Sequence, residues 1–145
     1  MRLWRISNYA DLSGIGGLQA SGRWHNKGKL IIYAAEHPAG AMLEMLVHVN
    51  WATLPKTFQL IAMDAAEPTT VDSTELPPNW MNDEQQCRNI GDAWLQAKSS
   101  LLRRVPSAIL PDTFNYLINP LHPQIASLKI HKANKIPLDP RLARN

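Results

Sequence analysis

The fold is decided by the stretch Ser21–His48, SGRWHNKGKLIIYAAEHPAGAMLEMLVH, which joins a basic loop, an apolar run and a helical pattern. The run Leu30–Ala34 is short and apolar, which is typical of a buried strand. A helix is predicted to begin at His37–Pro38, because proline fits the first helical position, where its missing N–H is not needed. The spacing i, i+3, i+4, i+7 predicts that this helix has an apolar face made of Met42, Met45, Leu46 and Val49.

Three side chains with useful chemistry come from this stretch: Arg23 from the loop, Tyr33 from the strand and Glu44 from the helix. On a helical wheel Glu44 lies opposite the apolar face, beside Gly40 and Ala41. The plain interpretation of that position is an exposed glutamate. A helical side chain also leans over the preceding turn, and two small residues there would leave room for a ligand. The wheel therefore allows both an exposed glutamate and a site residue.

The composition predicts a single globular domain covering residues 1–145. Hydrophobic residues make up 45% of the chain and charged residues 19%, which excludes a disordered chain. A net charge of +3 suits a phosphate-bearing small molecule or an acidic partner and is a weak indication of nucleic-acid binding. One cysteine excludes an internal disulfide, and the five histidines lack metal-ligand spacing. With no apolar leader or membrane-spanning run, we expect a soluble cytoplasmic protein without a metal site.

The rest of the chain predicts an α+β fold, a single compact domain of short strands with a few helices. A second helix is expected over Asp83–Ser100, with Gly91 weakening its middle. The segment Asn8–Ala20 is predicted to be a loop or lid, and Val71–Trp80 is predicted to be irregular. No G-x-G-x-x-G follows a strand, so a doubly wound fold is not supported. Strands are predicted at Leu3–Ile6, Thr57–Asp64, Arg103–Leu110, Ala126–His131 and Lys135–Asp139. The third of them is expected to be interrupted or edged by Pro106.

Short motifs along the chain resemble those of the RES domain, the toxin family of bacterial Xre–RES toxin–antitoxin pairs. Each motif is weak alone, and their order and spacing from Leu3 to Leu142 carry the resemblance. The region Thr53–Leu101 matches no motif. The matching residues are Gly22-Arg23-Trp24, Tyr33-Ala34, Glu44, Val105-Pro106-Ser107, Asn115-Tyr116-Leu117-Ile118-Asn119-Pro120 with His122-Pro123, and Asp139-Pro140-Arg141-Leu142.

The resemblance implies a fold similar to that of ADP-ribosyltransferases and an NAD-binding catalytic domain that consumes NAD as its substrate, with no cofactor. The family's arginine, tyrosine, glutamate and serine correspond to Arg23, Tyr33, Glu44 and Ser107. A cognate Xre-type antitoxin with a helix-turn-helix domain is implied as the partner that blocks the active site, with a toxin homodimer inside the complex. We therefore expect a growth-arresting toxin that cleaves the nicotinamide–ribose bond by hydrolysis or phosphorolysis.

The chemistry of NAD explains why one carboxylate can suffice. The nicotinamide ring is cationic in the dinucleotide and leaves as a neutral molecule, so no general acid is required. Positive charge grows on the ribose, and a carboxylate such as Glu44 would stabilise it or hold a ribose hydroxyl. A guanidinium binds a pyrophosphate through paired hydrogen bonds, which makes Arg23 the first candidate and Arg5 the second.

The same candidate residues also have structural interpretations. Tyr33 would stack on the nicotinamide or ribose, or would be a core tyrosine. Ser107 would donate to the ribose or to Glu44, or would cap a strand end. His25 would contact phosphate or lie in solvent, and Asn119 would bind NAD or hold a turn beside a proline. Each arginine would otherwise pair with a nearby acid or lie in solvent.

Sequence reasoning leaves other functions open. The acceptor of ADP-ribose would be water, phosphate or a protein side chain, and the last gives a protein ADP-ribosyltransferase. A nucleic-acid-binding or RNA-cleaving toxin is supported by basic residues, but they are scattered and lack an aromatic platform, so we expect no direct nucleic-acid contact and no membrane contact. A non-catalytic interaction domain is the third class. The basic residues concerned are Arg103, Arg104, Lys132 and Lys135.

Overall fold

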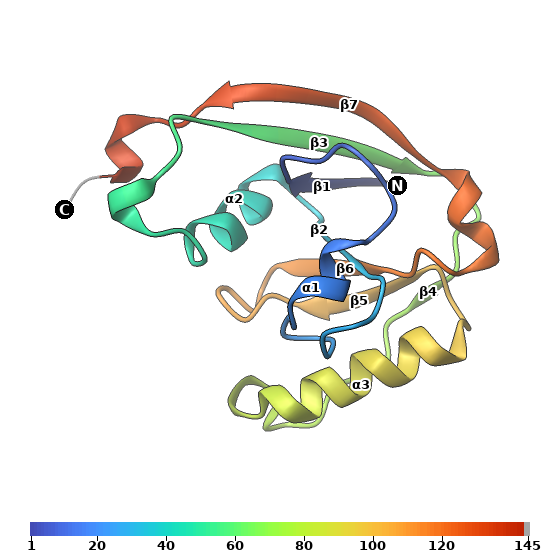
Figure 1. Cartoon of the computed structure of the whole chain (residues 1–145). Helices are drawn as coiled ribbons and strands as arrows, with labels where there is room; N and C mark the ends of the chain where they lie inside the picture. The colour runs from blue at the N-terminus through green and yellow to red at the C-terminus, as the bar shows by residue number, and fades with distance from the viewer. Residues whose placement is uncertain (144–145) are drawn as a thin grey trace.

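A single seven-stranded sheet forms the framework of the computed structural model, which describes residues 1–143 (Figure 1). The strand order is β4-β5-β6-β2-β1-β3-β7, and every neighbouring pair is antiparallel except β4 with β5. The strands are β1 (Arg2–Ile6), β2 (Ile32–Ala35), β3 (Thr57–Ala65), β4 (Val71–Asp72), β5 (Leu102–Pro106), β6 (Phe114–Ile118) and β7 (Leu128–Pro137).

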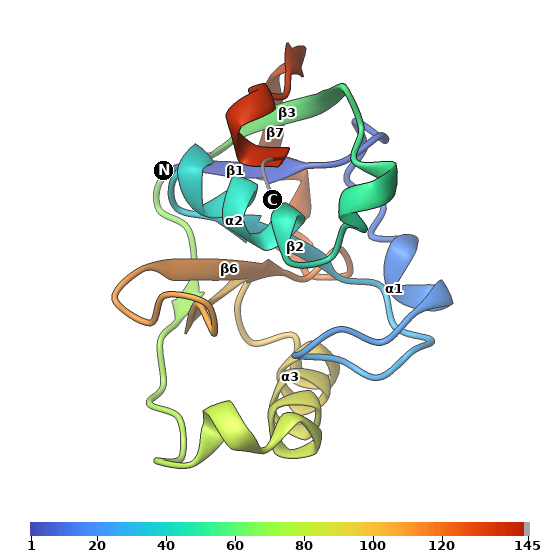
Figure 2. The same cartoon turned by 90° about the vertical axis from the view of Figure 1, so that its left-hand side faces the viewer.

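Three α-helices and four short 3-10 turns complete the described chain, which confirms the predicted α+β class. In Figures 1 and 2, α3 lies under the half of the sheet that contains β5 and β6, and α2 lies beside β1 and β2. The helices are α1 (Gly16–Gln19), α2 (Pro38–Leu46) and α3 (Glu84–Ala97). The 3-10 turns are Trp51–Thr53, Trp80–Asn82, Pro123–Ser127 and Pro140–Ala143. Within the described residues, no helix combines the length and apolar character needed to cross a membrane.

The shortest strand pairing in the sheet is the one between β1 and β2. Strand β1 pairs with β3 from Arg2 to Ile6, whereas it pairs with β2 only at Trp4 opposite Ala35. An uninterrupted antiparallel ladder would next place Arg5 opposite Ala34. The two strands separate instead, and the backbone opens between the two halves of the sheet.

Strands β2 and β6 contribute buried side chains to both faces of the sheet. One face forms a cluster with β1 and β3, and the other face packs against α3 and the loop that precedes β2. The first cluster includes Leu3, Ile32, Ala34, Ile61, Met63, Tyr116 and Ile118. The second includes Trp24, Ile31, Cys87, Trp94, Leu95, Val105 and Leu117.

The start of α2 confirms the sequence prediction. Pro38 occupies its first turn, and the side chain of His37 accepts a hydrogen bond from the Ala39 N–H. The predicted apolar face is wrong in extent, because the helix ends at Leu46 and Val49 lies beyond it. The buried residue of α2 is Ala41, and the neighbouring Gly40 approaches Ala35 of β2.

Other boundaries differ from the predictions for local reasons. The segment Asn8–Ala20 contains α1, where a Cβ on Gly17 would lie 2.1 Å from the Lys29 carbonyl oxygen, so the backbones touch. The predicted strand from Arg103 ends at Pro106, because the next residues turn. The predicted irregular segment Val71–Trp80 begins with β4.

The two predicted closing strands are one strand, β7. Its pairing with β3 shifts between Ala62, which lies opposite Lys132, and Met63, which lies opposite Ile130. His131 is the extra residue of this bulge. The bulge interrupts the alternation of side chains, and the sequence pattern on its two sides therefore reads as two separate strands.

Candidate active site

A cavity of about 790 Å³ opens where β1 and β2 separate. Its walls come from β1, β2, α2, the loop after Ala20, the first turns of α3, and the chain after β5. Four predicted site residues line it, although they lie far apart in the sequence: Arg5, Arg23, Tyr33 and Glu44. The structure thus brings the predicted arginines, tyrosine and glutamate together.

The loop that carries Arg23 is a tight turn. The Gly22 N–H donates to the His25 carbonyl oxygen at 3.2 Å, which closes four residues on themselves. Trp24 is buried in the core and stacks on Trp80 with 5.8 Å between ring centroids, while the neighbouring Arg23 lines the cavity. A Cβ at position 22 would lie 2.4 Å from the Tyr33 hydroxyl, so a side chain there would have to displace the phenol.

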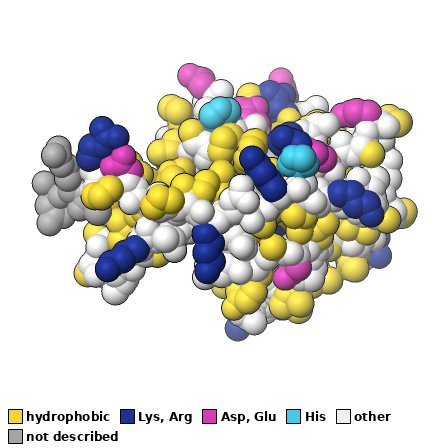
Figure 3. All heavy atoms as spheres, turned by 90° about the horizontal axis from the view of Figure 1, so that it is seen from above, with side chains coloured by type: hydrophobic (Ala, Val, Ile, Leu, Met, Phe, Trp, Pro, Cys, Tyr) yellow, Lys and Arg dark blue, Asp and Glu magenta, His cyan; other side chains and the backbone are white. Residues whose placement is uncertain are grey.

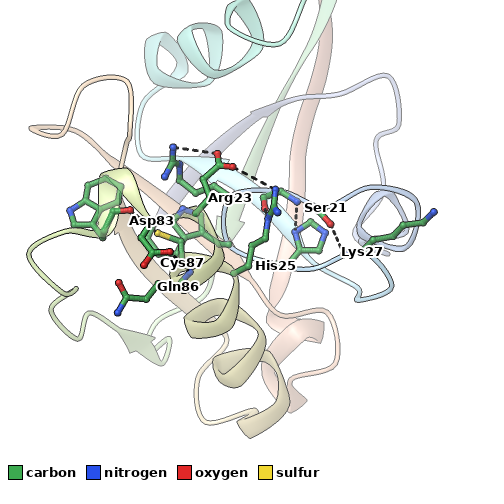
Figure 4. A network of polar contacts seen from close by, with 12 residues as sticks. Ser21, Arg23, His25, Lys27, Asp83, Gln86 and Cys87 are labelled. Carbon is green, nitrogen blue, oxygen red and sulfur yellow. Dashed lines mark hydrogen bonds and ion pairs between the residues drawn. The ribbon is translucent and has the colours of Figure 1, made fainter.

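Helix α3 holds this loop in place (Figure 4). The Arg88 Nε donates to the Gly22 carbonyl oxygen at 2.9 Å. Asn26 donates through its backbone N–H and its side-chain Nδ2 to the two carboxylate oxygens of Asp92, at 3.1 and 2.7 Å. A Cβ on Gly91 would lie 1.6 Å from the Trp24 carbonyl oxygen, so helix and loop touch through their backbones.

Three guanidinium groups line the cavity, from Arg5, Arg23 and Arg88. Arg23 Nη2 lies 3.6 Å from Glu84 Oε1, and Arg88 Nη2 lies 3.7 Å from Glu84 Oε2. The Nη1 of Arg23 is buried and has no hydrogen-bond partner among the described residues. Burial lowers the pKa of Arg5, although the charge of Asp11 opposes this, and the group remains a cation at neutral pH.

Glu44 is a half-buried, hydrogen-bonded carboxylate rather than an exposed helix residue. Its Oε1 accepts from the Ser107 hydroxyl at 2.9 Å and from the Asn115 Nδ2 at 2.7 Å. Within the described chain, its Oε2 receives no hydrogen bond. One oxygen is therefore held in place and the other is available to a ligand.

Ser107 combines both interpretations made from its sequence position. Its hydroxyl donates to Glu44, and its oxygen accepts from the N–H groups of Ile109 and Leu110 at 3.1 and 3.3 Å. The serine is 5% exposed and does not line the cavity itself. It positions the carboxylate and caps the end of β5.

Tyr33 and His25 hold the loop that carries Arg23 through hydrogen bonds. The Gly17 carbonyl oxygen can only accept, so His25 Nε2, 3.3 Å away, carries the proton and Nδ1 accepts. The Tyr33 hydroxyl then donates to His25 Nδ1 at 2.7 Å and accepts from the Trp24 N–H at 3.2 Å. Burial raises the pKa of Tyr33 well above its usual value, so the phenol is neutral at physiological pH. His25 is 3% exposed, which corrects its solvated alternative. It lines an adjoining cavity rather than this one, and its phosphate contact stays a prediction.

Asn119 is also absent from the cavity wall, and its predicted NAD contact is corrected. It is 1% exposed, its Nδ2 donates to the Leu95 carbonyl oxygen, and its Oδ1 accepts from the Leu121 N–H. Of the two asparagines in that motif, Asn115 is the one at the site. In β6 it lies opposite Val105, two residues before Ser107, and only the strand register shows this.

Sequence reasoning also missed Glu84 and Arg88, because α3 lies in the region that matched no motif. Their i, i+4 spacing was the available signal, but such pairs are common on exposed helices. The completed site has the carboxylate of Glu44 held by two donors, a neutral phenol, and three cations, two of which lie beside Glu84. Among residues 1–143, no group of His, Cys, Asp and Glu is placed to hold a metal ion. The arrangement suits a phosphate-bearing molecule with a positively charged centre near Glu44.

Comparisons with known proteins identify the family of this chain. The RES domain model matches residues 2–140. The chain is 48% identical over 147 residues to "Toxin Res" of Pseudomonas putida, covering 98% of this chain and 99% of the relative. It is 35% identical over 154 residues to the "Prs ADP-ribosylating toxin" of a Sphingobium species, covering 97% and 96%.

A solved structure shares the fold. The chain matches a chain in the crystal structure of the M. tuberculosis MbcT–MbcA toxin–antitoxin complex with a TM-score of 0.74, covering 98% of this chain and 86% of that chain. At 18% sequence identity, this likeness concerns the fold alone. The family model and the full-length relatives decide the family: the chain belongs to the RES domain family of toxins.

Proposed function

We propose that this RES-domain toxin consumes NAD by cleaving its nicotinamide–ribose bond in the cavity between β1 and β2. The observation that carries the proposal is the carboxylate of Glu44, held by two donors in a cavity that three arginines also line. The cavity volume of about 790 Å³ lies within the usual range for small-molecule sites. A cytoplasmic site of action follows from the substrate.

Each group has a separate task in this reaction. The two donors to Oε1 of Glu44 leave Oε2 free to face the ribose, where it stabilises the growing positive charge or holds a hydroxyl. The guanidiniums of Arg23, Arg88 and Arg5 bind the pyrophosphate. Tyr33 is a neutral phenol that packs against the nicotinamide-bearing half of NAD and does not act as an acid or a base.

The test is nicotinamide release by purified protein. We expect Glu44→Gln to lower the rate on the order of 10²–10³-fold, because the charge is lost while the shape is kept. Glu75→Gln, which neutralises an exposed carboxylate outside the cavity, is the matched control and should release nicotinamide at the wild-type rate. Wild-type activity in Glu44→Gln would remove Glu44 from the reaction.

The acceptor of the ADP-ribosyl group is proposed to be water or phosphate. A second candidate is a protein side chain, which the name of the Sphingobium relative, an ADP-ribosylating toxin, favours. Mass spectrometry of the products, with and without phosphate, separates the three: free ADP-ribose, a phosphorylated ADP-ribose, or a modified protein.

The proposed partner is a cognate Xre-type antitoxin, bound to a dimer of the toxin. The support is the family, together with the fold shared with a structure titled as a toxin–antitoxin complex. Co-expression with that antitoxin should give a complex that co-purifies and releases no nicotinamide. Light scattering on the complex would measure its stoichiometry.

The basic residues that favoured a nucleic-acid ligand do not form one surface. Arg103 is 6% exposed and pairs with Asp72, and the Arg104 guanidinium carbon lies 3.4 Å from the ring centroid of Phe114. Seen from the side of β7, lysines and arginines lie singly among acidic and apolar side chains (Figure 3). The geometry therefore favours a small anionic substrate over a polynucleotide.

A further inference from the structure

Glu84 is an acidic residue in the wall of a cavity whose proposed ligand is an anion. Its two carboxylate oxygens face different arginines, Oε1 toward Arg23 at 3.6 Å and Oε2 toward Arg88 at 3.7 Å. Both distances are those of ion pairs rather than of short charge-assisted hydrogen bonds. Glu84 itself is exposed, with 57% of its side chain accessible, whereas the side chains of the two arginines are 25% and 28% accessible.

Both arginines have other contacts that keep them in place without Glu84. Arg88 donates through Nε to the Gly22 carbonyl oxygen at 2.9 Å. Arg23 lies over the Trp80 ring, with 5.9 Å between its guanidinium carbon and the ring centroid, and its Nη1 is buried. The carboxylate therefore contributes negative charge more than it contributes orientation.

We propose that Glu84 is a specificity-determining residue that competes with the phosphates of the substrate for Arg23 and Arg88. A pyrophosphate that binds these arginines has to displace the carboxylate or lie beside it, and like charges at such distances repel. The competition weakens the affinity for phosphate-bearing ligands and raises KM. It acts on ground state and transition state alike, so kcat is unaffected. The inference rests on the proposed function for its substrate and on the ion pairs for its mechanism.

The experiment compares Glu84→Gln with the wild-type protein. Calorimetric titrations with ADP-ribose and with inorganic pyrophosphate should show binding about three- to fivefold tighter in the variant, a modest gain because the carboxylate is exposed. KM for NAD should fall by the same factor with kcat unchanged. The gain should shrink as salt is added, because salt screens exposed charges.

The control is again Glu75→Gln, which makes the same change in net charge outside the cavity and should bind both probes as the wild type does. Thermal unfolding verifies that each variant is folded. Unchanged or weaker binding of ADP-ribose by Glu84→Gln would overturn the inference and make Glu84 an organiser of the arginines. Tighter pyrophosphate binding by Glu84→Gln, with no nicotinamide release from either protein, would support the competition and overturn the proposed reaction instead.

Discussion

At the scale of the residue, the candidate site depends on two donors that meet at one oxygen. Ser107 and Asn115 both donate to Oε1 of Glu44, from the end of β5 and from β6. Neither is a plausible acid or base for breaking a bond whose leaving group departs neutral. Their effect on the reaction therefore passes through the position and the charge of Glu44.

Replacing Asn115 tests this role. In Asn115→Asp a second carboxylate would face Glu44 at the position of a 2.7 Å contact, and two like charges there raise the pKa of the pair. The active form is the ionised Glu44, so nicotinamide release should fall at neutral pH and recover as the pH rises. Asn115→Ala should lose up to about 10²-fold in kcat, without the shift in pH profile. A pH profile of kcat/KM in Asn115→Asp that overlays the wild-type curve would contradict the positioning role.

The sequence motifs named four residues that share one cavity, and they could not show the contacts that depend on strand register. Arg5, Arg23, Tyr33 and Glu44 do line one cavity. His25 and Asn119 belong to the same motifs, yet their polar atoms bond to the fold itself, because neighbours in a turn or strand face different surroundings. Nothing in a single sequence states which of two asparagines lies beside a serine eight or more residues away on another strand.

At the scale of the element, α3 is the support of the basic loop. Gly91 should not be read as a weak point of the helix, since the Trp24 carbonyl oxygen occupies the space that any side chain would take. Sequence reasoning found this helix and its glycine. It could not explain the glycine, because the loop that contacts it is nearly seventy residues away. A contact between such distant residues produces no periodic pattern in the sequence.

Substitution of Gly91 separates packing from helix propensity. Alanine in a helix is favoured over glycine by about 1 kcal/mol in isolation. Gly91→Ala should nevertheless lower the Tm and nicotinamide release, because the new Cβ would force α3 away from the loop. Gly40→Ala in α2 is the matched control, since its Cβ meets the Ala35 Cβ at an ordinary 3.4 Å. A Gly91→Ala protein with raised Tm and full activity would show that α3 does not set the loop.

The two-residue strand β4 is held by a charge pair as well as by its parallel pairing with β5. Arg103, 6% exposed, pairs with Asp72. Burial opposes ionisation of Asp72, but hydrogen bonds from Thr74 and the charge of Arg103 outweigh it and lower the pKa of Asp72. Because the folded-state pKa is depressed, this stabilisation is complete above the ordinary aspartate pKa of about 4 and is lost as the pH falls below it.

Asp72→Asn should therefore destabilise the protein at neutral pH, by about 3 kcal/mol because a buried guanidinium loses its counter-charge. The difference from the wild type should diminish in acid, where Asp72 itself becomes protonated. Urea unfolding of both proteins at neutral and acidic pH measures this. Asp139→Asn, which removes an exposed pair with Arg141, serves as the control and should change stability little. Equal unfolding midpoints for Asp72→Asn and wild type at neutral pH would refute the role of the pair.

At the scale of the whole molecule, the cavity exists because one sheet is nearly divided. The fold class followed from short strands and two amphipathic helices, and the resemblance supplied the architecture. The division did not follow, since β1 and β2 have the same strand-like sequences whether they pair along their length or at one position. The continuous strand β7 was also missed. Its bulge at His131 exchanges which side chains face each side of the sheet, so the alternation of apolar and polar residues is interrupted there.

The short pairing between β1 and β2 has a consequence for how long the folded toxin survives in the cell. On the proposed function, a dinucleotide in the cavity would contact Arg5 of β1 and Arg23 in the loop before β2, and would so connect the two halves of the molecule. Any ligand that binds only the folded state raises its resistance to unfolding in proportion to the logarithm of its concentration. On the proposed function, the toxin would therefore destroy the molecule that stabilises its folded state. We expect the lifetime of the toxin to shorten as the cellular NAD concentration falls, so that its own activity would limit how long it acts.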